Sequence, residues 1–133
     1  MNIHEYQGKA LLKANGVPVL EGVHCTSVEQ ALMAYDKLGS KVVAVKSQIH
    51  AGGRGKGTLF NPETREHVMD GGVKIAFSKD EVEKYSSHIL GNLLVTIQTG
   101  DEGKLVNNLY IESGCEIEPV SYTHLRAHET FAN

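Results

Sequence analysis

An apolar strand that runs into a loop of glycines and cations constrains this chain most. Residues 42–45 are Val, Val, Ala and Val, a pattern typical of a strand that is buried on both faces. Lys46 ends this predicted strand, and a lysine there is costly to bury unless it has a partner, which we expect to be anionic. The loop AGGRGK follows at residues 51–56. The sequence therefore predicts positive charge at the end of a buried strand.

The loop has the composition of an anion-binding site. Gly52, Gly53 and Gly55 allow positive φ and a close approach of the backbone to a ligand. Successive backbone N–H groups in such a loop form a concavity for anions, and Arg54 can hold a phosphate through two parallel hydrogen bonds. We therefore predict that a polyphosphate, most simply a nucleotide, binds Lys46 and this loop. The alternative is a solvated surface turn whose charges are incidental.

Two familiar nucleotide-binding patterns do not match this loop. A Walker A loop needs G-x-x-x-x-G-K-[ST] running into a helix, whereas here Lys56 is followed by Gly57 and Thr58 and by no helical period. The Rossmann pattern G-x-G-x-x-G is also absent.

The composition fits one small globular domain and disfavours several classes of function. The chain has 133 residues, of which 41% are hydrophobic and 22% are charged. A formal net charge of −3 and few aromatic residues argue against a nucleic-acid partner. No apolar run is long enough to cross a membrane, and the N-terminus lacks the features of a signal peptide. We therefore expect a cytoplasmic protein with two free thiols, Cys25 and Cys115.

Hydrophobic periodicity predicts a mixed α/β chain. Helices are expected at residues 3–15, 27–38 and 79–90, and strands or extended pieces at 19–25, 42–46, 73–77, 93–98 and 105–112. Thr26 with Glu29 and Ser78 with Glu81 have the spacing of capping boxes for the second and third helices. Asp70-Gly71 could turn a hairpin within a polar excursion, and residues 100–103 are expected to turn a hairpin between the last two strands.

Three stretches resemble the β-subunit family of succinyl-CoA synthetases, which are ADP-forming succinate–CoA ligases. They are NIHEYQ at residues 2–7, VKSQIHAGGRGK at 45–56 and LVTIQT at 94–99. The likeness covers residues 1 to about 117. It implies an incomplete, N-terminal part of an ATP-grasp domain at 1–117, with a mixed sheet and packing helices, followed by a tail at 118–133.

The resemblance also implies a set of nucleotide contacts. The matching residues are Lys46, Gly53, Arg54, Gly55, Glu112 and Cys115. In the family the lysine and the glycine loop hold phosphates, the glutamate lies near the adenine, and the backbone at the last position contacts the base. Considered without the family, Glu112 could be a solvated carboxylate at a strand end, and Cys115 a small buried hydrophobe.

The function implied is that of the nucleotide-binding β subunit of a tricarboxylic acid cycle ligase. Such an enzyme interconverts succinyl-CoA, phosphate and ADP with succinate, CoA and ATP. The resemblance implies ATP or ADP and Mg²⁺ as ligands and an α subunit as partner, in an αβ or α2β2 assembly. It implies no catalytic residue or metal ligand in this chain, because the phosphorylated histidine belongs to the other subunit and the Mg²⁺ ligands to the second half of the domain.

Several alternatives remain open on the sequence. A malate–CoA ligase β subunit shares most of these motifs, and the preference for ATP or GTP is not determined. A different class of function is that of an inactive fragment, or of a module that docks a partner subunit without catalysis.

The range 118–133 departs from the family pattern. The family's ribose-binding glutamate would fall at Val120, whose side chain accepts no hydrogen bond. His124 and His128 lie four residues apart, but with no third ligand in view we predict no metal site there. Residues 120–130 resemble translated sequencing adapter, so we expect a broken reading frame near Glu118 and a non-native or disordered tail. We also expect little or no catalysis by this chain alone, since it would provide one wall of a nucleotide cleft.

Overall fold

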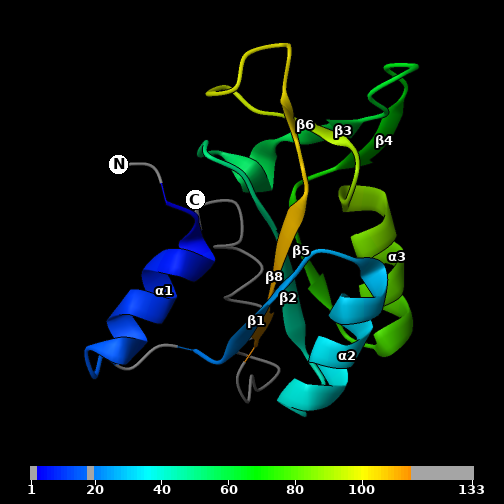
Figure 1. Ribbon diagram of the computed structural model, residues 1–133. Helices are drawn as coiled ribbons and strands as arrows, with labels where there is room; N and C mark the ends of the chain where they lie inside the picture. Colours follow the sequence, from blue (N-terminus) through cyan, green and yellow to red (C-terminus); the bar gives the residue numbers. More distant parts are fainter. Residues whose placement is uncertain (1–2, 18–19, 115–133) are drawn as a thin grey trace.

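The computed structural model describes residues 3–17 and 20–114, which form three α-helices, one 3₁₀ turn and eight strands (Figure 1). The helices are α1 (Glu5–Ala14), α2 (Val28–Leu38) and α3 (Lys79–Ile89), and the 3₁₀ turn is η1 (Arg54–Lys56). The strands are β1 (Gly22–Cys25), β2 (Val43–Gln48), β3 (Thr58–Phe60), β4 (His67–Asp70), β5 (Val73–Ala76), β6 (Leu93–Val95), β7 (Lys104–Leu105) and β8 (Asn108–Ser113). This is the mixed α/β architecture expected of part of an ATP-grasp domain.

The strands form two antiparallel sheets. Sheet A has the order β1-β8-β2-β5, and sheet B has the order β4-β3-β6-β7. The apolar strand β2 lies inside sheet A, where Val45 pairs with Ile111 and Lys46 with Tyr110 of β8. Because side chains alternate between the two faces of a strand, Val45 and Lys46 point to opposite sides of sheet A.

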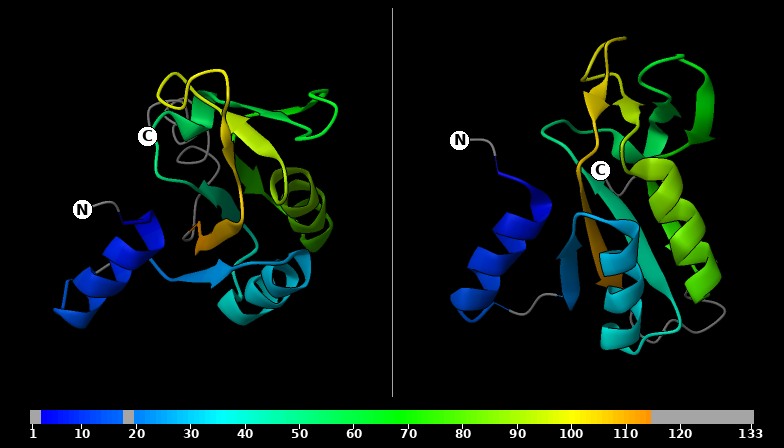
Figure 2. Two further views of the ribbon diagram at one scale, coloured as in Figure 1. Left: turned by 45° about the horizontal axis from the view of Figure 1, so that its top comes forward. Right: turned by 45° about the vertical axis from the view of Figure 1, so that its right-hand side comes forward.

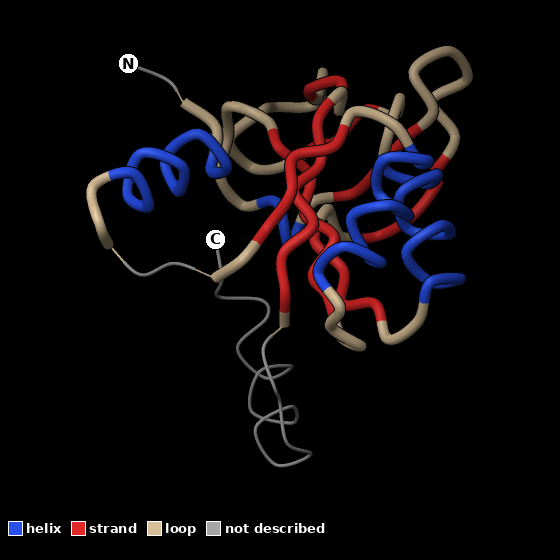
Figure 3. Tube along the Cα trace, turned by 60° about the horizontal axis from the view of Figure 1, so that its bottom comes forward, coloured by secondary structure: helices blue, strands red, loops and turns tan. Residues whose placement is uncertain are grey.

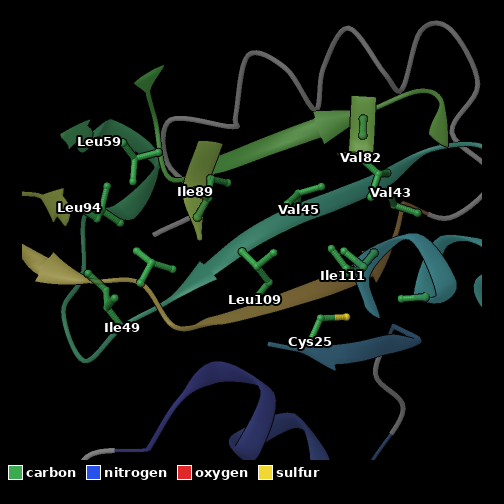
Figure 4. Packing of buried hydrophobic residues seen from close by; sticks show 14 residues of the cluster. Cys25, Val43, Val45, Ile49, Leu59, Val82, Ile89, Leu94, Leu109 and Ile111 are labelled. Carbon is green, nitrogen blue, oxygen red and sulfur yellow. The ribbon is translucent and has the colours of Figure 1, made fainter. Parts of the chain in front are cut away.

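The core lies between sheet A and two of the helices. In Figure 1 and in both views of Figure 2, α2 and α3 lie on one side of sheet A and α1 on the other. Fully buried side chains of β2 and β8, among them Val45 and Ile111, pack toward Val82 and Ile89 of α3 (Figure 4). Leu94 of sheet B belongs to the same cluster, so the two sheets share one core.

Helix α1 is attached differently from α2 and α3. None of its residues is buried, and Leu11 and Leu12 are 59% and 46% exposed. Its contacts with sheet A are polar or aromatic: the Tyr6 N–H donates to Gln48 Oε1 at 3.0 Å, and the Tyr6 ring stacks on His24 at 3.9 Å. Figure 3 shows α1 standing apart from the helices that cover the core.

Three strand predictions need correction. Strand β2 continues to Gln48, so Lys46 lies within the strand, because β8 pairs with it as far as the Gln48–Asn108 register. Residues 105–112 are not one strand: the chain leaves sheet B after β7 and enters sheet A at β8. Asp70-Gly71 turns no hairpin, because β4 pairs with β3 while β5 pairs with β2.

The predicted turn and helix caps are confirmed or differ from the structure by one residue. The hairpin at residues 100–103 is confirmed, since β6 and β7 pair in antiparallel register. Helix α3 begins with the expected cap, in which Ser78 Oγ accepts from Glu81 N at 3.2 Å. Helix α2 is capped one residue later than predicted, because Ser27 Oγ accepts from Gln30 N at 3.1 Å. Cys25 is a free thiol, and burial raises its pKa to about 11.

Cys115 and the range 118–133 lie outside the described residues, so the expectations about them stay predictions. Among residues 3–17 and 20–114, none of the helices is both long enough and apolar enough to cross a bilayer.

Candidate functional site

The glycine loop after β2 is held in place from several sides. Gly53 adopts a left-handed backbone conformation with φ of 73°, and η1 follows as a single 3₁₀ turn. The Gly52 N–H donates to Gln98 Oε1 at 2.8 Å, and the Gly72 N–H donates to Arg54 O at 2.8 Å. These bonds tie the loop to the segment after β6 and to the start of β5, so its backbone shape is set without a ligand.

Glycine is required at different positions of the loop for different structural reasons. Gly53 needs the positive φ that the sequence suggested, whereas Gly52 and Gly55 are not among the described residues with positive φ. At Gly52 a Cβ would approach the Gln98 side chain to 2.9 Å. The loop therefore needs one residue in the left-handed region and one close approach between backbone and side chain.

Lys46 has anionic partners within the chain itself. Its Nζ lies 3.0 Å from Glu5 Oε2 and 2.9 Å from Glu112 Oε1, and its side chain is 18% exposed. The β2–β8 register explains the second pair: Lys46 lies opposite Tyr110, and Glu112 is the next residue of β8 on the same face. The anionic partner expected from the sequence is therefore present, supplied by α1 and β8.

Glu112 is not the solvated carboxylate that was the alternative at sequence level. It is 4% exposed, and its two carboxylate oxygens contact the ammonium groups of Lys46 and Lys9. Burying a carboxylate without partners is costly, and these two charge-assisted hydrogen bonds offset that cost.

Glu5 of α1 is the centre of the charge cluster. Its carboxylate lies 3.0 Å from Lys46 Nζ, 3.1 Å from Lys9 Nζ and 3.5 Å from Arg54 Nη2. Gln48 Nε2 donates to it at 3.2 Å. Burial acts to raise the pKa of Glu5, but Lys46, Gln48 and Lys9 outweigh it and lower this pKa from 4.5 to about 2.

The other two cations of the cluster also face inward. Arg54 donates from Nη1 to Ser47 O at 2.9 Å, and its side chain is 17% exposed. Burial acts to lower the pKa of Lys9, but the carboxylates of Glu112 and Glu5 outweigh it and raise this pKa. We call Glu5, Lys9, Lys46, Arg54 and Glu112 the charge cluster; its three cations and two carboxylates leave one net positive charge.

Two cavities open beside the charge cluster. One, of about 390 Å³, is lined by residues of α1 and the glycine loop, including Glu5, His50, Gly52 and Arg54. The other, of about 210 Å³, lies between α1 and sheet A and is lined in part by Tyr6, Lys9, His24 and Tyr110. Ligand atoms entering either cavity would meet the charge cluster.

The structure brings together some of the predicted site residues. Lys46, Arg54 and Glu112 belong to one cluster, with Gly53 and Gly55 in the adjoining loop, whereas Cys115 lies outside the described residues. Sequence reasoning missed Glu5, Lys9 and Gln98. Glu5 and Lys9 are four residues apart on a helix, which marks them as a pair but not as neighbours of Lys46. Within the described part of the chain, no three His, Cys, Asp or Glu side chains gather as metal ligands would.

A family model described as an ATP-grasp domain matches residues 2–126. Curated relatives carry the name succinate–CoA ligase [ADP-forming] subunit beta. The one from Hyphomonas neptunium is 50% identical over 133 residues, which are all of this chain and 33% of the relative. The one from Ralstonia nicotianae is 54% identical over 125 residues, which are 94% of this chain and 29% of the relative. This chain thus spans about a third of the length of the curated relatives that it matches.

Proposed function

Because this chain belongs to the ATP-grasp domain family, we propose that it forms the nucleotide-binding part of the β subunit of an ADP-forming succinate–CoA ligase. The whole enzyme would be a cytoplasmic ligase that interconverts succinyl-CoA, phosphate and ADP with succinate, CoA and ATP. Its α subunit would be the partner of this chain and would carry the phosphorylated histidine.

One observation carries the proposal: the cationic side chains of Lys46 and Arg54 converge on a volume the size of one oxyanion. Lys46 Nζ and Arg54 Nη2 lie 3.0 Å and 3.5 Å from the Glu5 carboxylate. Cations arranged in this way offer charge-assisted hydrogen bonds that suit the oxygens of a phosphate group. The adjoining loop adds a fixed backbone shape.

The roles follow from the chemistry of each residue. Lys46 and Arg54 would neutralise phosphate charge, and the backbone of Gly53 and Gly55 would fix the position of the phosphates. Glu112 would accept a hydrogen bond from an exocyclic amine of the base, and the backbone at Cys115 would contact the ring edge. These contacts bind and orient the nucleotide, which is most of what a protein contributes to phosphoryl transfer.

Mg²⁺ would accompany the bound ATP and supply further charge neutralisation at its phosphates. Among the described residues, the carboxylates of Glu5 and Glu112 near the loop are both paired with lysines, which disfavours them as ligands of the ion. We therefore propose that the metal ligands come from outside the described residues.

The proposal is tested by titrating the purified chain with ATP in a calorimeter, using Lys46→Met and the control Lys41→Met. Lys41 is exposed, so its replacement makes the same charge change away from the charge cluster. Loss of one charge-assisted contact is expected to weaken ATP binding about tenfold or more in Lys46→Met. Circular dichroism verifies that each variant is folded. Absence of ATP binding by the parent chain, or equal affinities for the two variants, would contradict the proposal.

A further inference from the structure

Helix α1 places two groups of opposite charge in the proposed nucleotide site. We propose that α1 is an internal occupant of that site: Glu5 stands in for a phosphate against Lys46 and Arg54, and Lys9 stands in for a base amine against Glu112. A nucleotide must displace α1 to bind. This inference rests on the proposed function, because it concerns the same site.

The position of Glu5 is the first argument. One carboxylate takes up the hydrogen bonds of Lys46 at 3.0 Å and Lys9 at 3.1 Å, and lies 3.5 Å from Arg54. A phosphate oxygen would seek the same donors, since carboxylates and phosphates are bound by the same cationic groups. Lys46 and Arg54 cannot hold both anions in one place, so phosphate binding requires Glu5 to leave.

The position of Lys9 is the second argument. Its ammonium group contacts Glu112 Oε2 and lies 5.4 Å from the centre of the Tyr110 ring. An ammonium group donates hydrogen bonds to this buried carboxylate, as an exocyclic amine of a base would. Because Glu5 and Lys9 are one helical turn apart, a single movement of α1 would release both ends of the site.

The weak attachment of α1 is the third argument. Helix α2 buries Ala31 and Ala34, and α3 buries Val82, Ser86 and Ile89, whereas α1 buries none of its residues. An element held by charges and few apolar contacts opens at a lower free energy than the core does. In Figures 1 and 2, α1 lies on the opposite side of sheet A from the other two described helices, α2 and α3.

The first test compares Glu5→Gln with the parent chain, using tripolyphosphate and ATP as calorimetric probes. The substitution keeps the size of the side chain and removes the competing charge. We expect both probes to bind about tenfold more tightly to Glu5→Gln. Glu21→Gln is the matched control, because it makes the same charge change at a side chain that is 68% exposed. Equal or weaker binding by Glu5→Gln than by Glu21→Gln would overturn the inference.

The second test follows α1 directly by hydrogen exchange. Saturating ATP is expected to speed exchange of the α1 amides in the parent chain, because the helix is displaced. Slower exchange in α1 on ATP binding would show that the helix closes over the ligand, which would overturn the inference.

The two proposals fail in distinguishable ways. If the parent chain binds ATP in a manner that depends on Lys46 but Glu5→Gln binds no more tightly, the internal-occupant inference fails and the proposed function stands. If neither the parent chain nor Glu5→Gln binds ATP, both fail.

Discussion

At the scale of single residues, the charge cluster behaves as a balanced network rather than as isolated ion pairs. Burying a charge is costly, and the cost is offset only when partners remain in place. Glu112 illustrates this, because a carboxylate that is 4% exposed is paired with two lysines from different elements. Removal of one member therefore leaves the others uncompensated, so effects on stability must be measured alongside effects on binding.

The stability of the folded chain should depend on pH through Glu5. Its pKa falls from 4.5 to about 2 on folding, so its contribution to the free energy of unfolding is complete above pH 4.5. This contribution is lost as the pH drops from 4.5 toward 2, because the folded state must then accept a proton on a paired carboxylate. Urea unfolding at a series of pH values should show a steeper loss of stability in this window for the parent chain than for Glu5→Gln. Parallel pH profiles would refute the assignment, and Glu21→Gln should keep the parent profile.

At the scale of elements, the sequence predicted those parts whose signal is local. The apolar run of β2 and the Ser78 cap of α3 were found because neighbouring residues determine them. Strand β3 was missed because it is short and its pairing with β4 carries a register shift at Leu59/Phe60. The contact between Glu5 and Lys46 joins residues 41 positions apart, so it depends on where α1 is placed and not on any local pattern.

The cap of α2 gives a prediction at this scale. Ser27 Oγ accepts from Gln30 N at 3.1 Å, and losing such a cap typically costs about 1 kcal/mol. Ser27→Ala should therefore lower the free energy of unfolding by about that amount. Thr26→Ala is the matched control, because the Thr26 hydroxyl contacts the Gln30 side chain and no helix N–H. If Thr26→Ala lowered the free energy of unfolding more than Ser27→Ala, the N-cap residue of α2 would be Thr26, as the sequence predicted.

At the scale of the whole molecule, one core joins two sheets and leaves α1 outside. Leu59 and Leu94 of sheet B belong to the same buried cluster as Val45 and Ile111 of sheet A (Figure 4). Strand β8 follows β7 directly in the chain, so the backbone also connects the sheets at this point. We therefore expect sheets A and B to unfold together, with α1 opening at lower free energy.

A core substitution distinguishes this arrangement from two independent sheets. Ile111 is fully buried in sheet A, so Ile111→Ala should cost about 2–5 kcal/mol, while Ile97→Ala, at a side chain that is 98% exposed, should cost almost nothing. Hydrogen exchange under mildly denaturing conditions reports on each sheet separately. If the core is shared, Ile111→Ala will accelerate exchange in β3 and β6 as much as in β2 and β8. If exchange in sheet B is unchanged, the cluster is two cores in contact, and the two sheets unfold independently.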